Sequence, residues 1–324
     1  MRYLVTGGAG FIGSHYVRSL LDGSLTGDAS SVQVLDKLTY AGNPANLAPV
    51  AEDPRYSFVQ GDICDGVLLD ELVPGQDVVI NFAAETHVDR SISGPQDFVV
   101  TNVVGTQSLL DACRRHATPR VVHIGTDEVY GSIETGSWTE DSPLEPNSPY
   151  AASKAAGELL VRAYHRTYGM NVSSTRCSNN YGPYQYPEKV IPLFVTNLID
   201  GLRVPLYGDG LNVRDWLHVD DHVRGIQIVA ERGEPGAAYN IGGGVELTNR
   251  ELTERILQHM GRDWDAAVEQ VPDRLGHDRR YSVDDSRIRD LGYAPTRSFD
   301  EAIDETIAWY QDHPEWWRPL KGSA

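Results

Sequence analysis

The chain alternates short β-type runs with segments of helical periodicity, and this alternation constrains its fold more than any other feature. Apolar residues recur at helical spacing between the runs, most clearly over 11–21, 98–116 and 153–168. Continuously apolar strands joined by helices form a parallel sheet that is covered on both faces. The predicted fold class is therefore α/β, with a doubly wound Rossmann-type parallel sheet. The predicted strands are 3–6, 32–36, 56–60, 77–82, 120–125 and 172–177.

The alternation weakens after Cys177, where the stretch YGPYQYPEK is rich in proline, glycine and tyrosine. Further on, DWLHVDDHVRGIQIVAERG and AAYNIGGG predict one more helix and one more strand that return to the sheet. We therefore expect a Rossmann domain at 1–176, completed by 215–242. The remaining segments, 177–214 and 243–324, predict a smaller, mainly α substrate lobe.

Composition narrows the classes of partner. The net charge of −18 argues against nonspecific binding to nucleic acid. No run of 18 apolar residues is present, so no membrane span is expected, and the start MRYLVTGGAG indicates a first strand rather than a signal peptide. Cys64, Cys113 and Cys177 lack metal-ligand spacing. They predict free thiols in a reducing, cytoplasmic compartment, and no metal site.

The stretch GGAGFIG follows the first predicted strand and opens a helix. Glycines at 7, 10 and 13 permit a tight turn and a close backbone approach to a pyrophosphate, which would bind the free N–H groups of the helix. Asp36 ends the second strand, 23 residues after Gly13. A carboxylate there accepts hydrogen bonds from a ribose and repels a 2′-phosphate, which favours NAD over NADP. The alternative is a glycine-rich turn without a ligand.

Residues after the later strands extend this predicted NAD site. Asp62 and Ile63 follow the third strand and could reach the adenine, and the small residues after the fourth strand offer backbone to the cofactor. The predicted cofactor-binding residues are Gly7, Gly10, Phe11, Ile12, Gly13, Asp36, Lys37, Leu38, Thr39, Asp62, Ile63, Phe82, Ala83, Ala84, Thr101, Tyr150, Lys154 and Asn180.

Tyr150 and Lys154 open a predicted helix in the stretch YAASK. Positions i and i+4 share one helix face, and an ammonium beside a phenol lowers the phenol pKa from about 10 towards neutrality. Such a tyrosine can take a proton from a sugar hydroxyl while hydride leaves the same carbon. The alternative is a solvated pair, because this spacing also occurs by chance.

Two adjacent acids, Asp127 and Glu128, follow an apolar run in the stretch GTDEVYG. Adjacent carboxylates repel each other, and both this repulsion and partial burial raise a carboxyl pKa, so that one group keeps its proton near neutral pH. The pair therefore suggests a strand that delivers polar groups to a site. A solvated strand end or a helix cap is the alternative.

Together the motifs GGAGFIG, AAETHVDRSI, GTDEVYG and YAASK resemble the extended short-chain dehydrogenase/reductase superfamily. Within it the chain is similar to the dTDP-glucose 4,6-dehydratase family, and the match continues through RCSNNYGPYQYPEKVIP, LYGDGLNVRDWLHVDDH, YNIGGG and DRLGHDRRY. The resemblance covers nearly the whole chain. Relatives that epimerise or decarboxylate nucleotide sugars typically lack the adjacent acid pair.

The resemblance implies an NAD-dependent lyase that converts dTDP-glucose to dTDP-4-keto-6-deoxyglucose and water, early in deoxysugar biosynthesis. Tyr150 and Lys154 would serve oxidation at C4, and Thr126 would hydrogen-bond the C4 oxygen. Glu128 would remove the C5 proton while Asp127 protonates the leaving C6 hydroxyl. Hydride would then return to C6, which regenerates NAD⁺ in place. The catalytic residues implied are Thr126, Asp127, Glu128, Tyr150 and Lys154.

On the substrate side, the resemblance implies contacts from Thr86, Thr126, Asn179, Lys189, Val190, Pro205, Tyr207, Arg214, Asn249, Arg274 and His277. Arg214 and Arg274 could bind the diphosphate. Selection of thymine over uracil depends on one methyl group, worth about 1 kcal/mol. The resemblance also implies a homodimer paired through the helices at 98–116 and 150–165. Another nucleotide-sugar dehydratase or epimerase, for example one that uses a UDP-sugar, and a non-enzymatic NAD-binding sensor remain as alternatives.

Overall fold

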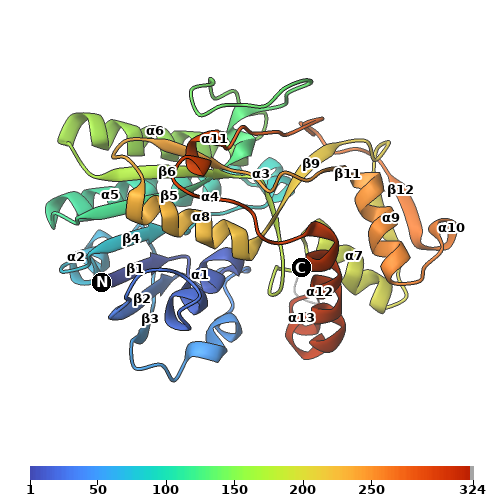
Figure 1. Ribbon diagram of the computed structural model, residues 1–324, viewed down its shortest axis with the longest axis horizontal. Helices are drawn as coiled ribbons and strands as arrows, with labels where there is room; N and C mark the ends of the chain where they lie inside the picture. Colours follow the sequence, from blue (N-terminus) through green and yellow to red (C-terminus); the bar gives the residue numbers. More distant parts are fainter. Residues whose placement is uncertain (322–324) are drawn as a thin grey trace.

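The computed structural model describes residues 1–321 and contains a central sheet of seven parallel strands (Figure 1). Their order, β10-β6-β5-β4-β1-β2-β3, reverses between β1 and β4, as in doubly wound Rossmann sheets. The predicted α/β class is therefore confirmed. The strands are β1 (Arg2–Thr6), β2 (Ser31–Asp36), β3 (Tyr56–Gln60), β4 (Val78–Asn81), β5 (Arg120–Thr126), β6 (Val172–Cys177) and β10 (Ala238–Ile241).

Helices cover both faces of this sheet, because its strands are apolar on both sides. In β1, Tyr3 and Val5 belong to the hydrophobic cluster that also holds residues of α1 (Phe11–Leu21) and α8 (Val219–Arg232). The intervening Leu4 belongs to the cluster on the opposite face, under α2 (Gly66–Leu72), α5 (Thr106–Arg115) and α6 (Pro149–Tyr168). Successive side chains of a strand point to opposite faces, so every second residue of β1 packs under a different helical layer.

The segment predicted as one helix over 98–116 is interrupted. It begins in α4 (Pro95–Val99), after α3 (Val88–Ser93), passes through a π-helical turn, η2 (Val100–Gly105), and continues as α5. The wider turn holds Asn102 inward, where its side-chain amide donates to Glu85 O at 3.0 Å and to Ser153 Oγ at 2.8 Å. A single π turn inside a helix is typical of functional regions, and periodicity alone did not reveal it.

The C-terminal lobe holds two small sheets, one of β7 (Asn179–Tyr181), β9 (Val213–His218) and β11 (Glu246–Thr248), the other of β8 (Val204–Tyr207) and β12 (Val268–Val271). The prediction of a helix from Asp215 was wrong at its start, because Asp215–His218 continue β9 and pair with β7 and β11 rather than with the central sheet. The helices of this lobe are α7 (Val190–Ile199), α9 (Asn249–His259), α10 (Trp264–Ala267), α12 (Phe299–Asp312) and α13 (Pro314–Lys321).

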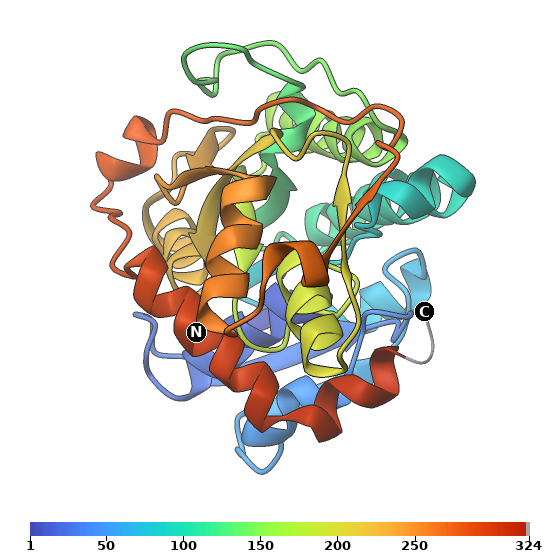
Figure 2. The ribbon, with the colours of Figure 1, turned by 90° about the vertical axis from the view of Figure 1, so that its right-hand side faces the viewer.

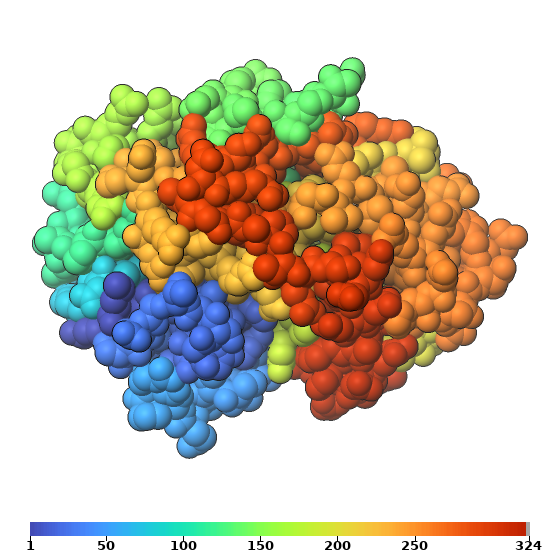
Figure 3. All heavy atoms as spheres, in the orientation of Figure 1, coloured from blue at the N-terminus to red at the C-terminus, as the bar shows by residue number. Residues whose placement is uncertain are grey.

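These helices pack around a separate apolar cluster that includes Phe194, Trp216 and Trp317. Seen from the side in Figure 2, α12 and α13 run across the face of this lobe, and Figure 3 shows the lobe in contact with the N-terminal half. We propose the two-part division expected from the sequence as the domain organisation, and the separate cores support it. No helix within residues 1–321 is both long and apolar enough to cross a membrane. The short helices η1 (Pro44–Val50), η3 (Asp127–Tyr130) and α11 (Ser286–Arg289) complete the described elements.

Candidate active site

A single cavity runs from the glycine-rich turn after β1 to the acid pair after β5. It lies at the carboxyl ends of the parallel strands, beside the point where the strand order reverses, which is where open α/β sheets bind ligands. Every predicted cofactor-binding residue except Leu38 lines this cavity. The Leu38 side chain packs instead against the hydrophobic cluster under α1.

The glycine-rich turn packs so closely that Gly7 and Gly13 have no room for a side chain. Gly7 has φ +69°, and a Cβ atom there would lie 2.5 Å from Ala83 N. A Cβ atom on Gly13 would lie 2.3 Å from Gly7 O. Gly10 caps α1 without a side-chain hydrogen bond, which leaves the first N–H groups of the helix open to an anionic ligand. The turn therefore fits a dinucleotide pyrophosphate.

Asp36 shapes the next part of the cavity wall. Its two carboxylate oxygens accept backbone hydrogen bonds from Ala9 N at 2.9 Å and from Leu38 N at 2.8 Å. Burial raises the Asp36 pKa, and these two hydrogen bonds oppose that rise. Each carboxylate oxygen can accept a second hydrogen bond, so the group can still bind a ribose hydroxyl. Lys37 and Asp62, which also line the cavity, form an ion pair at 2.8 Å.

Tyr150 and Lys154 enter the cavity from the first turns of α6, which begins at Pro149 and is capped by Ser148 Oγ, an acceptor for Ala151 N at 3.1 Å. Lys154 Nζ donates to Ile124 O at 2.6 Å. Burial lowers the Lys154 pKa to about 8. Both side chains line the cavity, on the helix face predicted from their spacing.

The expectation that Lys154 lowers the Tyr150 pKa towards neutrality was wrong for the protein alone. Burial and the nearby carboxyl groups, Glu128 first among them, raise the Tyr150 pKa well above its ordinary value. A hydrogen bond with Thr126 opposes this rise only in part. In the unliganded cavity the phenol therefore stays protonated.

Asp127 and Glu128 occupy η3, the single turn that follows β5. The turn is held by Glu128 N, which donates to Thr126 Oγ1 at 3.3 Å. Asp127 is only 3% exposed, and its buried Oδ2 has no hydrogen-bond partner among residues 1–321. Burial, then the charges of Glu128 and Asp215, raise the Asp127 pKa well above its ordinary value. The expected direction is confirmed: Asp127 keeps a proton that it can donate.

Glu128 faces the cationic side of the site. Burial raises its pKa, and the charges of Arg274, Lys189 and Arg214 oppose that rise. Nearby cations favour the ionised form of a carboxyl group, so Glu128 ionises more readily than Asp127. The two adjacent acids therefore have different environments, which is the arrangement that separates a base from an acid.

The predicted substrate residues fall into two groups. Thr86, Thr126, Asn179 and Lys189 line the cavity, and Lys189 Nζ donates to Thr86 O at 3.1 Å. Arg214 is buried, donates to Asp278 O at 2.9 Å and lies 4.3 Å above the Tyr281 ring. The predicted residues that do not line the cavity lie in the C-terminal lobe: Val190, Pro205, Tyr207, Arg214, Asn249, Arg274 and His277.

Two of these residues, Arg274 and His277, make defined contacts with neighbouring side chains. Arg274 lies 3.9 Å from Asp89, and its Nε is buried without a partner. His277 Nδ1 lies 2.6 Å from Asp273 Oδ1, and the His277 and Tyr207 rings meet edge to face with centroids 6.4 Å apart. The charge of Arg274 acts on Glu128, so this side chain lies near the acid pair.

Sequence reasoning missed several residues of the site. Glu85, Cys177 and Glu188 line the cavity, and the charges of Asp215 and Asp278 act on the acid pair. One signal could have identified Cys177: it ends β6, the strand paired with β5, and lies in register with Thr126. The contributions of Asp215 and Asp278 arise from another lobe, and no local pattern indicates them.

The sequence matches a known family model and closely related curated proteins. A family model described as GDP-mannose 4,6 dehydratase matches residues 4–306. A dTDP-glucose 4,6-dehydratase of Streptomyces niveus is 59% identical over 99% of this chain and 96% of its own length.

Solved structures of related enzymes superpose closely on this chain. The dTDP-glucose 4,6-dehydratase DesIV of Streptomyces venezuelae, solved with NAD bound, superposes with a TM-score of 0.97 at 61% identity over 99% of this chain and 100% of its own. A UDP-glucuronic acid 4-epimerase of Bacillus cereus, solved with UDP-glucuronic acid and NAD, is more distant, with a TM-score of 0.90 and 28% identity over 96% and 99% of the two chains.

Proposed function

The chain belongs to the GDP-mannose 4,6-dehydratase family and, within it, to the dTDP-glucose 4,6-dehydratases, and from this premise we propose that it converts dTDP-glucose to dTDP-4-keto-6-deoxyglucose and water with bound NAD. One observation carries the proposal. A buried carboxyl group with a raised pKa, Asp127, shares a cavity with Glu128, Tyr150 and Lys154. Dehydration needs an acid in addition to a redox pair, and this cavity contains both.

The glycine-rich turn and the N-terminus of α1 bind the pyrophosphate of NAD, and Asp36 accepts hydrogen bonds from the adenosine ribose. When bound, NAD would supply the hydride acceptor for C4 and, once reduced, the hydride donor for C6, and the oxidised ring would add a positive charge to the cavity. This positive charge would lower the Tyr150 pKa, which burial and the charge of Glu128 otherwise hold too high for a base.

In the first step, Tyr150 takes the proton of the C4 hydroxyl as hydride leaves C4. The Lys154 ammonium stabilises the phenolate, and the Thr126 hydroxyl donates to the developing C4 carbonyl oxygen. The product of this step is a 4-keto sugar, whose carbonyl acidifies the proton on C5.

The elimination uses the acid pair. Glu128 takes the C5 proton and Asp127 protonates the C6 hydroxyl, so that the C6–O bond breaks, water leaves and a C5–C6 double bond forms. Glu128 exchanges its proton with solvent and protonates C5, while hydride transfer to C6 completes the product. Over the cycle Tyr150 gains one proton and Asp127 loses one, and exchange with solvent restores both groups. The net reaction is the loss of water.

Arg214, Arg274 and Lys189 bind the substrate diphosphate in this proposal. Their charges act together on Glu128, which supports their convergence around that carboxyl group. Two phosphates in a strongly acidic protein need such a local group of cations. The nucleoside lies towards Tyr207 and Asn249, where the edge-to-face contact of Tyr207 and His277 offers an aromatic surface to a base.

We also propose a homodimer and a cytoplasmic setting. Val100, Val104, Leu159 and Tyr168 are exposed on η2 and α6, two neighbouring elements, and form an apolar surface of the kind that pairs subunits. The three cysteines are free, which supports a reducing compartment.

Incubation of the purified protein with dTDP-glucose tests the proposal. A 4-keto-6-deoxy product should form without net release of NADH, and UDP-glucose should serve as the matched control for the base. A C4 epimer as the product would instead indicate an epimerase. Retention of NAD with no turnover of any nucleotide sugar would indicate a sensor.

A further inference from the structure

A buried polar network lies directly behind the acid pair. The Arg176 side chain, on β6, is 6% exposed, and its Nε lies 3.0 Å from each carboxylate oxygen of Glu158. Its other nitrogens donate to Glu158 and to the hydroxyl of Tyr130. None of Arg176, Glu158 and Tyr130 lines the cavity. A buried ion pair is costly to desolvate, so its presence here calls for a role other than stability.

The network connects the two catalytic elements. Glu158 lies on α6, four residues after Lys154 and eight after Tyr150, and so shares their helix face. Tyr130 is the last residue of η3, the turn that begins with Asp127 and Glu128. Arg176 therefore links the helix of the redox pair to the turn of the acid pair.

Tyr130 is held from several sides. Its hydroxyl donates to Asn240 Oδ1 at 2.8 Å, and its ring stacks on Trp138 with centroids 6.0 Å apart at 17°. Burial raises the Tyr130 pKa to about 12, so the hydroxyl keeps its proton and remains a donor to Asn240. A hydroxyl that donates and accepts in fixed directions restricts the turn more than an apolar contact does.

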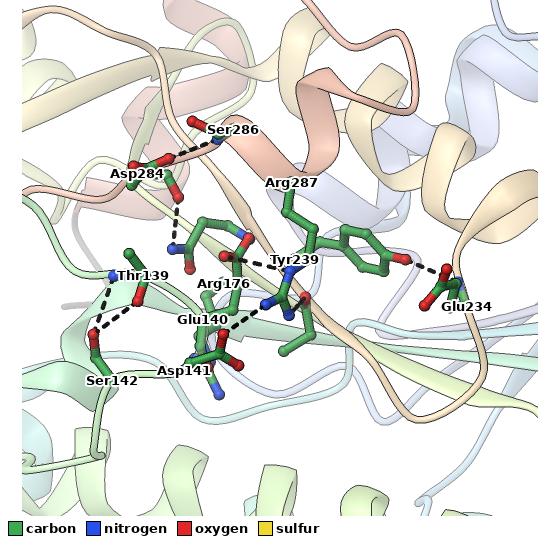
Figure 4. A network of polar contacts seen from close by, with 12 residues as sticks. Thr139, Glu140, Asp141, Ser142, Arg176, Glu234, Tyr239, Asp284, Ser286 and Arg287 are labelled. Atoms are coloured by element: carbon green, nitrogen blue, oxygen red, sulfur yellow. Dashed lines mark hydrogen bonds and ion pairs between the residues drawn. The ribbon is translucent and has the colours of Figure 1, made fainter.

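The outer part of the network fixes the loop between η3 and α6 (Figure 4). Glu140 accepts from Asn240 N at 2.9 Å through Oε1, and its carbonyl accepts from Arg176 at 3.2 Å. Arg287 bridges the same loop, 3.7 Å from Glu140 and 3.0 Å from Asp141. The start and the middle of the segment that separates the acid pair from the redox pair are therefore attached to one set of polar contacts.

We propose that Tyr130, acting through Arg176 and Glu158, is a positioning residue that sets the acid pair against the redox pair. This inference rests on the proposed function. Oxidation at C4 needs only the side chains of α6 and Thr126, whereas elimination needs Asp127 and Glu128 at C6 and C5 of the same sugar. Loosening the turn should therefore slow elimination and leave oxidation intact.

Tyr130→Phe tests this, because it removes the hydroxyl and keeps the stacked ring. Tyr293→Phe is the matched control, since it deletes a buried hydroxyl that donates to Gly242 O at 3.1 Å outside the active site. In Tyr130→Phe, kcat should fall about tenfold, as the loss of one positioning hydrogen bond implies, while KM for dTDP-glucose stays unchanged. Bound NADH should accumulate transiently in a single turnover. Tyr293→Phe should show neither effect at a similar Tm.

Three results would overturn the inference. A Tyr130→Phe enzyme with unchanged kcat would do so, as would one that is slow with its NAD⁺ fully oxidised, or one that matches Tyr293→Phe in every readout. Glu158→Gln provides a second variant and should also accumulate NADH; if it does not fold, Tyr130→Phe decides. A wild-type protein that does not turn over dTDP-glucose would instead overturn the proposed function, and this inference with it.

Discussion

At the scale of single residues, the acid pair is explained by the difference between its two environments. Asp127 is enclosed, with one oxygen that lacks a partner, and Glu128 faces three cationic side chains. Adjacent carboxylates are unfavourable in a core, but the same adjacency keeps a proton on Asp127. Burial and the repulsion by Glu128 are unfavourable for stability, and they also raise the Asp127 pKa so that this group can act as an acid.

Two substitutions should separate the acid from the redox pair. Tyr150→Phe removes the group that accepts the C4 proton, so bound NAD⁺ should stay oxidised when substrate is added. Asp127→Asn leaves Tyr150 and Lys154 in place, so oxidation should proceed while turnover falls about 10²–10⁴-fold, the usual contribution of a general acid. Stopped-flow absorbance of bound NADH should rise only in the Asp127 variant. If both variants stall with NAD⁺ oxidised, the role given to Asp127 is wrong.

Lys154 should reduce the free energy of unfolding at neutral pH. Its pKa falls from 10.5 to about 8 on folding, so below pH 8 the native state holds a buried charge that the unfolded state solvates. Between pH 8 and 10.5 the unfolded state binds more protons than the native state, and stability rises with pH.

Lys154→Met should therefore raise the free energy of unfolding at pH 7 by about 1–3 kcal/mol, after the loss of the hydrogen bond to Ile124, and should abolish turnover. The gain should shrink as pH rises from 8 to 10.5. Urea unfolding at pH 7 and pH 9 measures both effects. A variant that is less stable than wild type at pH 7 would contradict the pKa assigned to Lys154.

At the scale of elements, the turn between β1 and α1 decides cofactor binding. Gly13→Ala would place a methyl group 2.3 Å from Gly7 O, so the turn must open. The purified variant should retain no NAD and should turn over no substrate. Gly66→Ala is the control, because a methyl group at this helical position meets nothing within 4 Å. The cofactor content of the two proteins, measured by absorbance after denaturation, should differ; equal retention would show that Gly13 is not needed for close approach.

Much of the element structure follows from the sequence, because periodicity and turn chemistry are local. The strand at 56–60 and the helix at 11–21 have their predicted bounds. The interruption of 98–116 depends on Asn102 bonding to Glu85 and Ser153, which are far away in the sequence. The start of α8 was misplaced because β9 has its partners in β7 and β11, neither of which periodicity identifies.

The same limit applies to the site. The glycines, Asp36 and the acid pair are local signals, and all of them line one cavity. The pairing of Arg176 with Glu158 joins a strand to a helix 18 residues earlier, and only the folded chain brings them together. The Tyr150 pKa was predicted in the wrong direction because burial and the charge of Glu128, which a local motif does not report, raise it.

At the scale of the whole molecule, the cavity needs both lobes: the central sheet supplies the cofactor side, and Asn179, Asn180 and Lys189 line it from the C-terminal half. We propose that the exposed apolar residues Val100 and Val104 of η2 and Leu159 of α6 pair with a second copy of the chain. Val104→Lys would place a charge on this surface and should shift the protein to a monomer in analytical ultracentrifugation. Val67→Lys, an exposed valine on α2, is the control and should leave the assembly state unchanged. A Val104 variant with the wild-type mass would exclude this surface.

The central claim is an internal hydride transfer coupled to proton exchange at C5. Proton NMR of the product formed from dTDP-glucose in D₂O tests it directly. The account predicts one solvent deuterium at C5 and a C6 methyl group without deuterium, because its third hydrogen comes from C4 of the same molecule. Deuterium in the methyl group, or a C5 position that keeps its original hydrogen, would contradict the account.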